Sequence, residues 1–349
     1  MASTALPLPA EGPRRLRSLN ILHDLPQVAD LIELCFETTL DDDGQSYVQQ
    51  MRRASADGAF LTWASRIMES SSMPLAGYVW EEDGKIIGNA SLVFQAHRGR
   101  RLAMIANVAT HPSFRGRGIG RALAERSMLG ALQRGAKDIW LQVRHDNPTA
   151  IRIYTELGFV ERARRTTYQS GNSAGSGSRG TDSARSTRSA GAQRVVATSR
   201  QPSRQQWPRQ YEWLRRAHPD EISWYAHWEW NRLEPSLKNL LYRLFMQSEQ
   251  RQWCATGDQY LLATATWVPT YRVPNSLWLA AAPDSGVAAT RVLEIARQEL
   301  SQYRKISVEH PAGELKEEIE AAGFSEFRTL LWMRATEDGV LRIQNKKET

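Results

Sequence analysis

The R-G-R-G-I-G run at residues 115–120 has the residue types and spacing of an anion-binding loop. It follows an apolar segment at 103–109 that is expected to be a strand, and it leads directly into a helical pattern at 118–133. Glycines allow positive φ angles and let a ligand approach the backbone closely. The first amide groups of a helix have no partners within the helix and carry a partial positive charge. This arrangement suits a pyrophosphate group.

Two other interpretations of the loop compete with this one. A glycine-rich turn without a ligand is the simpler alternative. A dinucleotide-binding loop is disfavoured because the preceding strand is not the first of the fold, and because Asp138 begins its strand rather than ending it. No Gly-Lys-Ser/Thr follows the glycines, which excludes a Walker-type nucleotide site.

The elements that must position this loop alternate between strands and helices. Asp83-Gly84 is a strong hairpin signal between two apolar runs. Gly158 suits the residue just after a helix. Strands are expected at 15–20, 78–80, 86–94, 103–109, 138–143 and 159–168, and helices at 26–39, 47–65, 118–133 and 149–157. This order predicts an α/β fold in which helices cover both faces of a mixed sheet.

Two stretches together resemble a known family. The run V-A-T-H-P-S-F-R-G-R-G-I-G-R-A-L at 108–123 is similar to motif A of the GNAT acyltransferases, Arg/Gln-x-x-Gly-x-Gly/Ala, with Arg115, Gly118 and Gly120 at the defining positions. Residues 140–159 are similar to motif B, with its Asn, Ala, Tyr and Gly-Phe at family spacing. The resemblance covers about 150 residues. It implies an α+β domain with a mixed, mostly antiparallel twisted sheet flanked by helices, and acetyl-CoA as co-substrate.

The resemblance also implies roles for individual residues. The pantetheine arm of acetyl-CoA would bind the backbone of Val108, Ala109 and Thr110. Asn147 would contact the same arm, and Tyr154 would protonate the leaving thiolate, since a tyrosine pKa near 10 suits that donor. An aromatic packing role is the alternative for Tyr154. The pyrophosphate would be held by the loop and the first residues of its helix: Arg115, Gly116, Arg117, Gly118, Ile119, Gly120 and Arg121.

The general base is less well defined by the sequence. Asn107 lies where many family members hold a Glu or a bound water, and it could hold a water itself. His111 has a useful pKa range but could equally be a loop residue packed against Pro112. Acidic residues in the first helices could attract a cationic amine or simply be solvated: Glu33, Glu37 and Asp41–Asp43.

The charge of the chain is concentrated in one segment. The net charge is +7, and residues 171–209 contain seven arginines and one aspartate, so the rest of the chain is nearly neutral. The composition of 171–209, rich in Ser, Gly and Arg, predicts a disordered linker. Nucleic acid is therefore not an expected partner. The linker divides the chain into an N-terminal tail at 1–14, a catalytic domain at 15–170, a second domain at 210–336 and a C-terminal tail at 337–349.

The second half faintly repeats the first. Gly323-Phe324 aligns with Gly158-Phe159, but Ile319 then stands where the first half has Tyr154, and no glycine loop precedes the helix at 287–300. The second half thus resembles a degenerate GNAT domain of a tandem protein, and an unrelated α/β domain is the alternative. The aromatic residues at 211–230 could line an acceptor pocket or pack the core. The two domains are expected to pack on each other, and the sequence leaves open a homodimer.

The remaining composition excludes several classes of protein. No apolar run is long enough for a membrane span, and no signal peptide is recognisable, so the expected location is cytoplasmic and no membrane partner is expected. Cys35 and Cys254 are far apart and lie among apolar residues, so we expect buried thiols and no metal site.

The expected function is transfer of an acetyl group from acetyl-CoA to a primary amine by direct attack, with Tyr154 as general acid. The acceptor could be a small molecule or a protein amine. A non-catalytic acyl-CoA-binding regulatory or scaffold protein is the alternative, and an adaptor whose arginine-rich linker binds an acidic partner is a third possibility.

Overall fold

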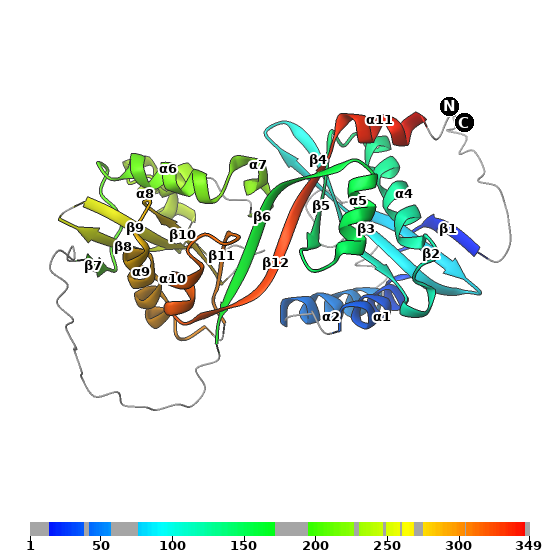
Figure 1. The fold of residues 1–349 in the computed structure, drawn as a ribbon, viewed down its shortest axis with the longest axis horizontal. Coiled ribbons are helices and arrows are strands. Elements are labelled where there is room, and N and C mark those ends of the chain that lie inside the picture. The colour runs from blue at the N-terminus through cyan, green and yellow to red at the C-terminus, as the bar shows by residue number, and fades with distance from the viewer. Residues whose placement is uncertain are drawn as a thin grey trace. The chain divides into compact units, whose positions relative to one another are not determined.

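The computed structural model describes residues 14–37, 42–56, 76–171, 195–226, 230–246, 249–258, 260–268, 275–303 and 305–345. The chain forms two compact units (Figure 1). Unit 1 comprises residues 1–162 together with 332–349, and unit 2 comprises residues 163–331. Two strands, β6 (Phe159–Ser170) and β12 (Phe324–Ala335), contribute residues to both units.

Unit 1 is a mixed sheet with helices on both faces, as predicted. Its strands are ordered β1-β2-β3-β4-β5-β12. The pairs β1–β2, β2–β3 and β3–β4 are antiparallel, and β4–β5 is parallel. The remaining elements in chain order are β1 (Arg14–Ser18), α1 (Leu25–Phe36), α2 (Asp42–Ala56), β2 (Ala76–Glu82), β3 (Lys85–His97), β4 (Arg100–Thr110), the 3-10 turn η1 (Pro112–Phe114), α4 (Ile119–Gln133), β5 (Asp138–Arg144), α5 (Pro148–Glu156) and α11 (Glu337–Asn345). The hairpin predicted at Asp83-Gly84 joins β2 to β3, and both residues have positive φ.

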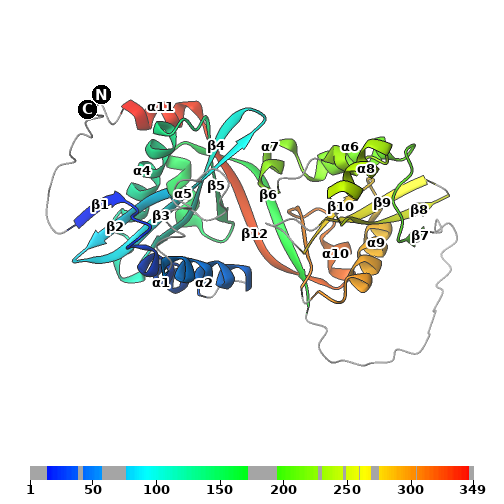
Figure 2. The same ribbon diagram turned by 180° about the vertical axis from the view of Figure 1, so that it is seen from behind.

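The alternation of side chains along the strands separates the two helical layers. Val79 and Ala109 belong to a buried cluster with Val28 and Ile32 of α1. A side chain at Gly88 would instead contact Ile119 and Leu123 of α4. Figure 1 accordingly shows α1 and α2 along one side of the sheet and α4 along another, and Figure 2 shows the same arrangement from behind.

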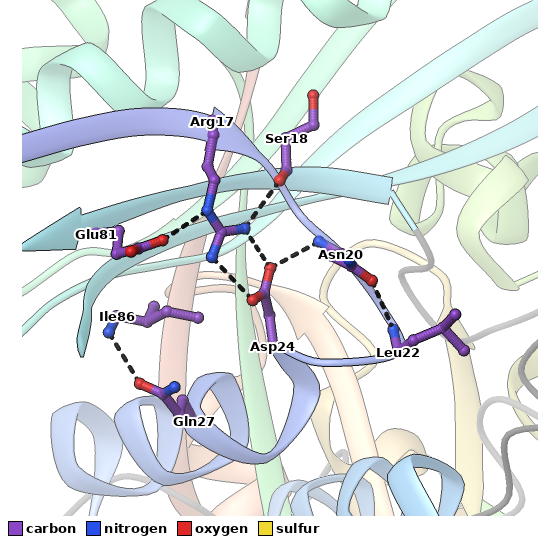
Figure 3. A network of polar contacts seen from close by, with 8 residues as sticks. All are labelled: Arg17, Ser18, Asn20, Leu22, Asp24, Gln27, Glu81 and Ile86. Carbon is purple, nitrogen blue, oxygen red and sulfur yellow. Dashed lines mark hydrogen bonds and ion pairs between the residues drawn. The ribbon is translucent and has the colours of Figure 1, made fainter. Parts of the chain in front are cut away.

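A polar network fixes the start of α1 against the sheet (Figure 3). The guanidinium group of Arg17 in β1 donates to both carboxylate oxygens of Asp24, over 2.6 and 2.9 Å, and to Glu81 of β2 over 2.7 Å. Asp24 is buried, and it also accepts the backbone N–H of Asn20 over 2.7 Å. Gln27 accepts the N–H of Ile86 over 3.0 Å. A buried carboxylate is stable only when it is paired. Asp24, the residue before α1, must therefore stay next to Arg17, and this defines where α1 begins.

Residues 337–349 were predicted to be a tail, and this prediction is wrong for residues 337–345. They form α11, in which Gly339 and Ile343 are buried. Thr336 caps the helix by accepting the N–H of Gly339 over 3.1 Å, and Glu337 and Asp338 lie in its first turn.

Unit 2 has the same kind of mixed sheet, ordered β12-β6-β11-β10-β9-β8-β7. The pair β10–β11 is parallel, and β6–β11, β7–β8, β8–β9 and β9–β10 are antiparallel. One face packs against α9 through a core that includes Trp253 and Trp267. The other packs against α6 and η3 through a cluster that includes Leu214, Trp230 and Trp278. The remaining elements are β7 (Val195–Thr198), α6 (Trp207–Ala217), α7 (Asp220–Ser223), the turns η2 (Trp224–Ala226) and η3 (Trp230–Leu233), α8 (Leu237–Met246), β8 (Arg251–Gly257), β9 (Tyr260–Trp267), β10 (Ser276–Ala281), α9 (Gly286–Glu299), β11 (Ser307–Pro311) and α10 (Lys316–Ala321).

The prediction that residues 171–209 are a disordered linker is wrong for the last part of that segment, from Val195 on. Val195–Thr198 form β7, paired with Cys254–Gly257 of β8, and α6 begins at Trp207. The β-branched residues of the V-V-A-T run favour an edge strand, and this preference outweighs the polar composition of the residues around them. The part at 172–194 lies outside the described residues. The compact units also divide the chain at 162/163 and 331/332, whereas the boundaries predicted for the two domains were 170 and 210.

Candidate active site

The strand β4 carries a bulge at its C-terminal half. Asn89 of β3 pairs with Ala109 and Ser91 pairs with Ala106, so Asn107 and Val108 share a single partner position. Asn107 has a φ of 51°, which is rare for a residue other than glycine. Its carbonyl accepts a hydrogen bond of 3.0 Å from the Asn89 side chain, which holds the bulge in place.

The same part of β4 diverges from β5. The parallel pairing between them covers Leu102–Ile105 of β4 and Asp138–Leu141 of β5. The last residues of each strand lie beyond that pairing: Ala106–Thr110 in β4 and Gln142–Arg144 in β5. Asn107, Val108 and Thr110 are only half-buried. The predicted pantetheine-binding residues therefore lie on a strand whose backbone is open on the β5 side.

The glycine loop leads from this strand to the uncapped start of α4. Gly118 is the residue before the helix, with a φ of 78° and no side-chain cap. Gly116 also has a φ of 78°, and a Cβ atom at either glycine would meet no atom within 4 Å in the part of the chain that is described. The first intrahelical bond runs from Ala122 N–H to Gly118 C=O over 3.0 Å, so the amides of residues 119–121 precede the helical ladder. Open space next to free amide donors is the geometry of an anion cradle.

The three arginines of the loop differ in their partners. Arg115 is exposed, and its Nε donates to the carbonyl of Thr110 over 3.3 Å. Arg117 lies over the ring of Phe114 at 4.8 Å and 3.7 Å from Glu82. Arg121 is already paired with Glu125 and Glu156. The backbone amides and Arg115 are thus better placed than Arg121 to hold a phosphate.

Asn147 is the residue just before α5, and Tyr154 lies in the last turn of that helix. Asn147 is exposed and caps the helix, because its Oδ1 accepts the N–H of Ala150 over 3.1 Å. Tyr154 is 7% exposed and packs edge-on against Phe159 with ring centroids 6.1 Å apart. Burial raises the pKa of the Tyr154 hydroxyl. The hydroxyl therefore keeps its proton at neutral pH, as a general acid must.

Of the residues considered for the general base or for attracting a cationic amine, His111 and Glu33 have structural partners. His111 accepts the N–H of Ser113 over 3.3 Å and packs edge-on against Phe114, which gives it a place in the loop. Glu33 pairs with Arg52 over 2.6 Å. Glu37 is exposed just after α1, and the side chains of Asp41–Asp43 lie outside the described residues.

Tyr47 of α2 is a residue that sequence reasoning missed. Its hydroxyl accepts a hydrogen bond of 2.9 Å from the Asn107 side chain, and burial raises the pKa of that hydroxyl. Cys35 of α1 reaches the same strand, with its Sγ 3.3 Å from the carbonyl of Thr110. Neither contact has a sequence signal, because both join elements that are far apart along the chain. The prediction of buried thiols is confirmed for Cys254 and is wrong for Cys35, which is only half-buried.

In unit 2, side chains lie at the positions that correspond to the open edge of β4 and the start of α4 in unit 1. The pairing of β10 with β11 covers only Ser276–Leu277. Just beyond it, Nε2 of His218 lies 3.3 Å from the carbonyl of Leu279. Arg165 donates to Nδ1 of His218 over 2.7 Å, so the proton of this neutral imidazole must be on Nε2. At the start of α9, the carboxylate of Glu318 occupies the space that a side chain at Gly286 would need.

No group of three or more His, Cys, Asp or Glu side chains suited to a metal occurs within the described ranges. None of the helices described is long and apolar enough to cross a membrane.

Comparison with known proteins places this site in a family. Residues 27–159 match the sequence model of the acetyltransferase (GNAT) family. This part of the chain belongs to the GNAT family. The matched region contains the β4 bulge, the glycine loop and α5, so the sequence resemblance to GNAT motifs is confirmed at the level of the family.

Curated relatives match over shorter stretches. The [ribosomal protein bS18]-alanine N-acetyltransferase of Escherichia coli strain K12 is 39% identical over 66 residues, which is 19% of this chain and 45% of that protein. The streptothricin acetyltransferase of Streptomyces lavendulae is 36% identical over 78 residues, 22% of this chain and 40% of that protein. The chain thus spans about half the length of these GNAT relatives or less.

Solved GNAT structures match most of the chain. A glucosamine N-acetyltransferase region of a fungal multi-domain β-N-acetylglucosaminidase superimposes with a TM-score of 0.52 at 13% identity, over 93% of this chain and 38% of that one. A tandem GNAT protein from the clavulanic acid pathway gives a TM-score of 0.47 at 14% identity, over 92% and 98%. The fold is that of two GNAT-like units, as predicted, and at these identities the likeness concerns the fold alone.

Proposed function

We propose that unit 1 transfers an acetyl group from acetyl-CoA to a primary amine. The observation that carries the proposal is the continuity of three features: the open backbone edge of β4, the loop at 115–118 and the uncapped start of α4. Together they offer hydrogen-bond partners for an extended amide-containing arm and then for a pyrophosphate. The open space at Gly116 and Gly118 fits such a ligand.

In this proposal the backbone of Val108, Ala109 and Thr110 binds the pantetheine arm. The amides of residues 116–121, with Arg115, bind the pyrophosphate. Asn147, exposed at the start of α5, contacts the arm. A thioester held in this way is fixed next to the bulge at Asn107, and a fixed geometry is itself a large part of catalysis in direct transfer.

The chemical step is attack of the neutral amine nitrogen on the thioester carbonyl. A C–N bond forms, the C–S bond breaks, and the sulfur accepts a proton from the Tyr154 hydroxyl. The proton lost by the nitrogen passes to a water held by Asn107 or to solvent, and Tyr154 is reprotonated from solvent. Because burial raises the pKa of Tyr154, the hydroxyl is a donor over the whole physiological pH range.

The acceptor class is a primary amine. One matching relative is named for an alanine of ribosomal protein bS18 and another for streptothricin, so a protein N-terminus and an amino-bearing small molecule are the two acceptors to test first. The chain matches under half of each of these relatives, so the assay must decide between the protein N-terminus and the small molecule as acceptor.

The test is an assay of thiol release from acetyl-CoA with a panel of acceptors: a peptide with an N-terminal alanine, a lysine-containing peptide, streptothricin and spermidine. Wild type should acetylate at least one of them, and Tyr154→Phe should lower kcat by about 10²- to 10⁴-fold with little change in acetyl-CoA affinity. Tyr260→Phe, at an exposed tyrosine of unit 2, is the matched control and should behave as wild type. Tight acetyl-CoA binding without turnover of any acceptor would favour the non-catalytic acyl-CoA-binding alternative.

A further inference from the structure

Residues 332–345, the C-terminal segment, belong to unit 1 although unit 2 precedes them in the chain. Trp332 packs edge-on against Trp140 of β5, with ring centroids 6.4 Å apart, and both indoles are 2% exposed. Arg334 pairs with Asp138, whose side chain is buried at the start of β5. The segment is therefore built into the core of the unit that carries the glycine loop.

The segment also binds the end of α5. The carbonyl of Gly158, the second residue after that helix, accepts two hydrogen bonds from Thr336: 2.9 Å from its N–H and 3.0 Å from its hydroxyl. The same hydroxyl accepts the N–H of Gly339 over 3.1 Å. Thr336 thus caps α11 and anchors the turn after α5 with one side chain.

Gly158 and Gly339 meet backbone to backbone. A Cβ atom at Gly339 would lie 2.9 Å from Cα of Gly158 and 2.9 Å from the carbonyl oxygen of Leu157. A Cβ atom at Gly158 would clash with Cα of Gly339, and Gly158 also has a φ of 86°. The distances below 3.0 Å involve backbone atoms, which can give way only if the helix end moves.

Tyr154 is one helical turn before this contact. α5 has nine residues, and its last turn closes through the Leu157 N–H to Ile153 C=O bond of 3.1 Å. The Tyr154 ring packs on Phe159, the residue directly after Gly158. Because so short a helix is rigid only through its tertiary contacts, a shift at Gly158 moves Tyr154.

We propose that Thr336 and Gly339 are positioning residues for Tyr154, so that the C-terminal segment is a working part of the catalytic unit. The proposal rests on the acid role of Tyr154 in the proposed function. It predicts that changes in the segment lower kcat and leave acetyl-CoA binding unchanged, since none of its residues lies in the β4–α4 loop.

The test uses the full chain with Gly339→Ala and Thr336→Val, and with Leu341→Ala, at an exposed residue of the same helix, as control. Three quantities are measured: amide exchange over residues 151–158, acetyl-CoA affinity by calorimetry, and kcat with an acceptor that the panel of amines identifies. We expect faster exchange, unchanged affinity and a fall in kcat of about ten- to a hundredfold for Gly339→Ala and Thr336→Val. Thr336→Ser, which keeps the hydroxyl, should restore wild-type values.

A double-mutant cycle with Tyr154→Phe separates positioning from general destabilisation. If Gly339 acts through Tyr154, Gly339→Ala should cause little further loss of kcat in the Tyr154→Phe protein. A full additive loss, or a loss of acetyl-CoA affinity equal to the loss of kcat, would overturn the proposal. If Tyr154→Phe alone turns over as wild type, or no amine is acetylated, the acid role fails, and unchanged exchange at 151–158 in Gly339→Ala would then overturn the anchoring as well.

Discussion

The side-chain amide of Asn107 donates a hydrogen bond of 2.9 Å to the hydroxyl of Tyr47. This bond ties the bulge of β4 to α2 across 60 residues of chain. Since Asn107 has a φ of 51°, the bulge combines an unusual backbone with a side-chain tether. The tether sets the position of the strand on which we propose that the thioester lies.

Replacing Asn107 should separate the two contributions. Asn107→Ala loses the hydrogen bond and places an alanine at positive φ, with an expected loss of about 1–3 kcal/mol in the free energy of unfolding. Asn107→Gly also loses the bond but tolerates the backbone, so it should be the less destabilised of the two. Urea unfolding of both variants measures this difference. A glycine variant as unstable as the alanine variant would show that the backbone at this bulge is unstrained.

Burial of Tyr154 should make the protein sensitive to alkali. Its folded pKa is raised above the unfolded value of about 10. The stabilisation is therefore complete below about pH 10 and is lost as the pH rises toward the folded pKa, by about 1.4 kcal/mol per pH unit. Tyr154→Phe should make the unfolding free energy fall less steeply between about pH 10 and 11, by up to that amount per pH unit. An unchanged slope would mean that the hydroxyl is accessible to solvent, contrary to its burial.

Each chain should bind one acetyl-CoA. In unit 2, His218 approaches the carbonyl of Leu279 just beyond the β10–β11 pairing, and Glu318 fills the space beside Gly286 at the start of α9. A carboxylate at a helix N-terminus repels a second anion while it stabilises the helix. Calorimetry should give one site per chain, and Glu318→Ala should leave that number unchanged because His218 is still in place. Two sites per chain in wild type would contradict this account of unit 2.

The local features of unit 1 were predictable from sequence because they depend on local chemistry. The hairpin at Asp83-Gly84, the helix after Gly118 and the glycine at 158 follow from backbone preferences that act within a few residues. The helix α11 also has a local signal, since Thr336 is followed by two acidic residues and then Gly339, Val340 and Ile343, but its distance from the GNAT-like motifs favours a tail when the sequence is considered alone.

The features that sequence could not supply join distant segments. The pairing of Asn107 with Tyr47, of Cys35 with Thr110 and of Thr336 with Gly158 depends on how the sheet and helices pack. The short strand β7 has no clear signal in the sequence because polar residues surround it, and its pairing with β8 is what identifies it as a strand. The partners of Arg121 were also unpredictable, because Glu156 is on another helix.

The most direct test of the central claim is a calorimetric titration of acetyl-CoA into wild type, Gly118→Glu and Gly135→Glu. Gly118 and Gly135 flank the same helix α4, have φ angles of 78° and 79°, and have no atom within 4 Å of a Cβ among the described residues, so the two substitutions carry matched strain. We predict saturable binding to wild type and to Gly135→Glu and none to Gly118→Glu, because only the latter places a carboxylate where the pyrophosphate should lie. Equal binding to all three proteins, or no binding to folded wild type, would contradict the donor site proposed for unit 1.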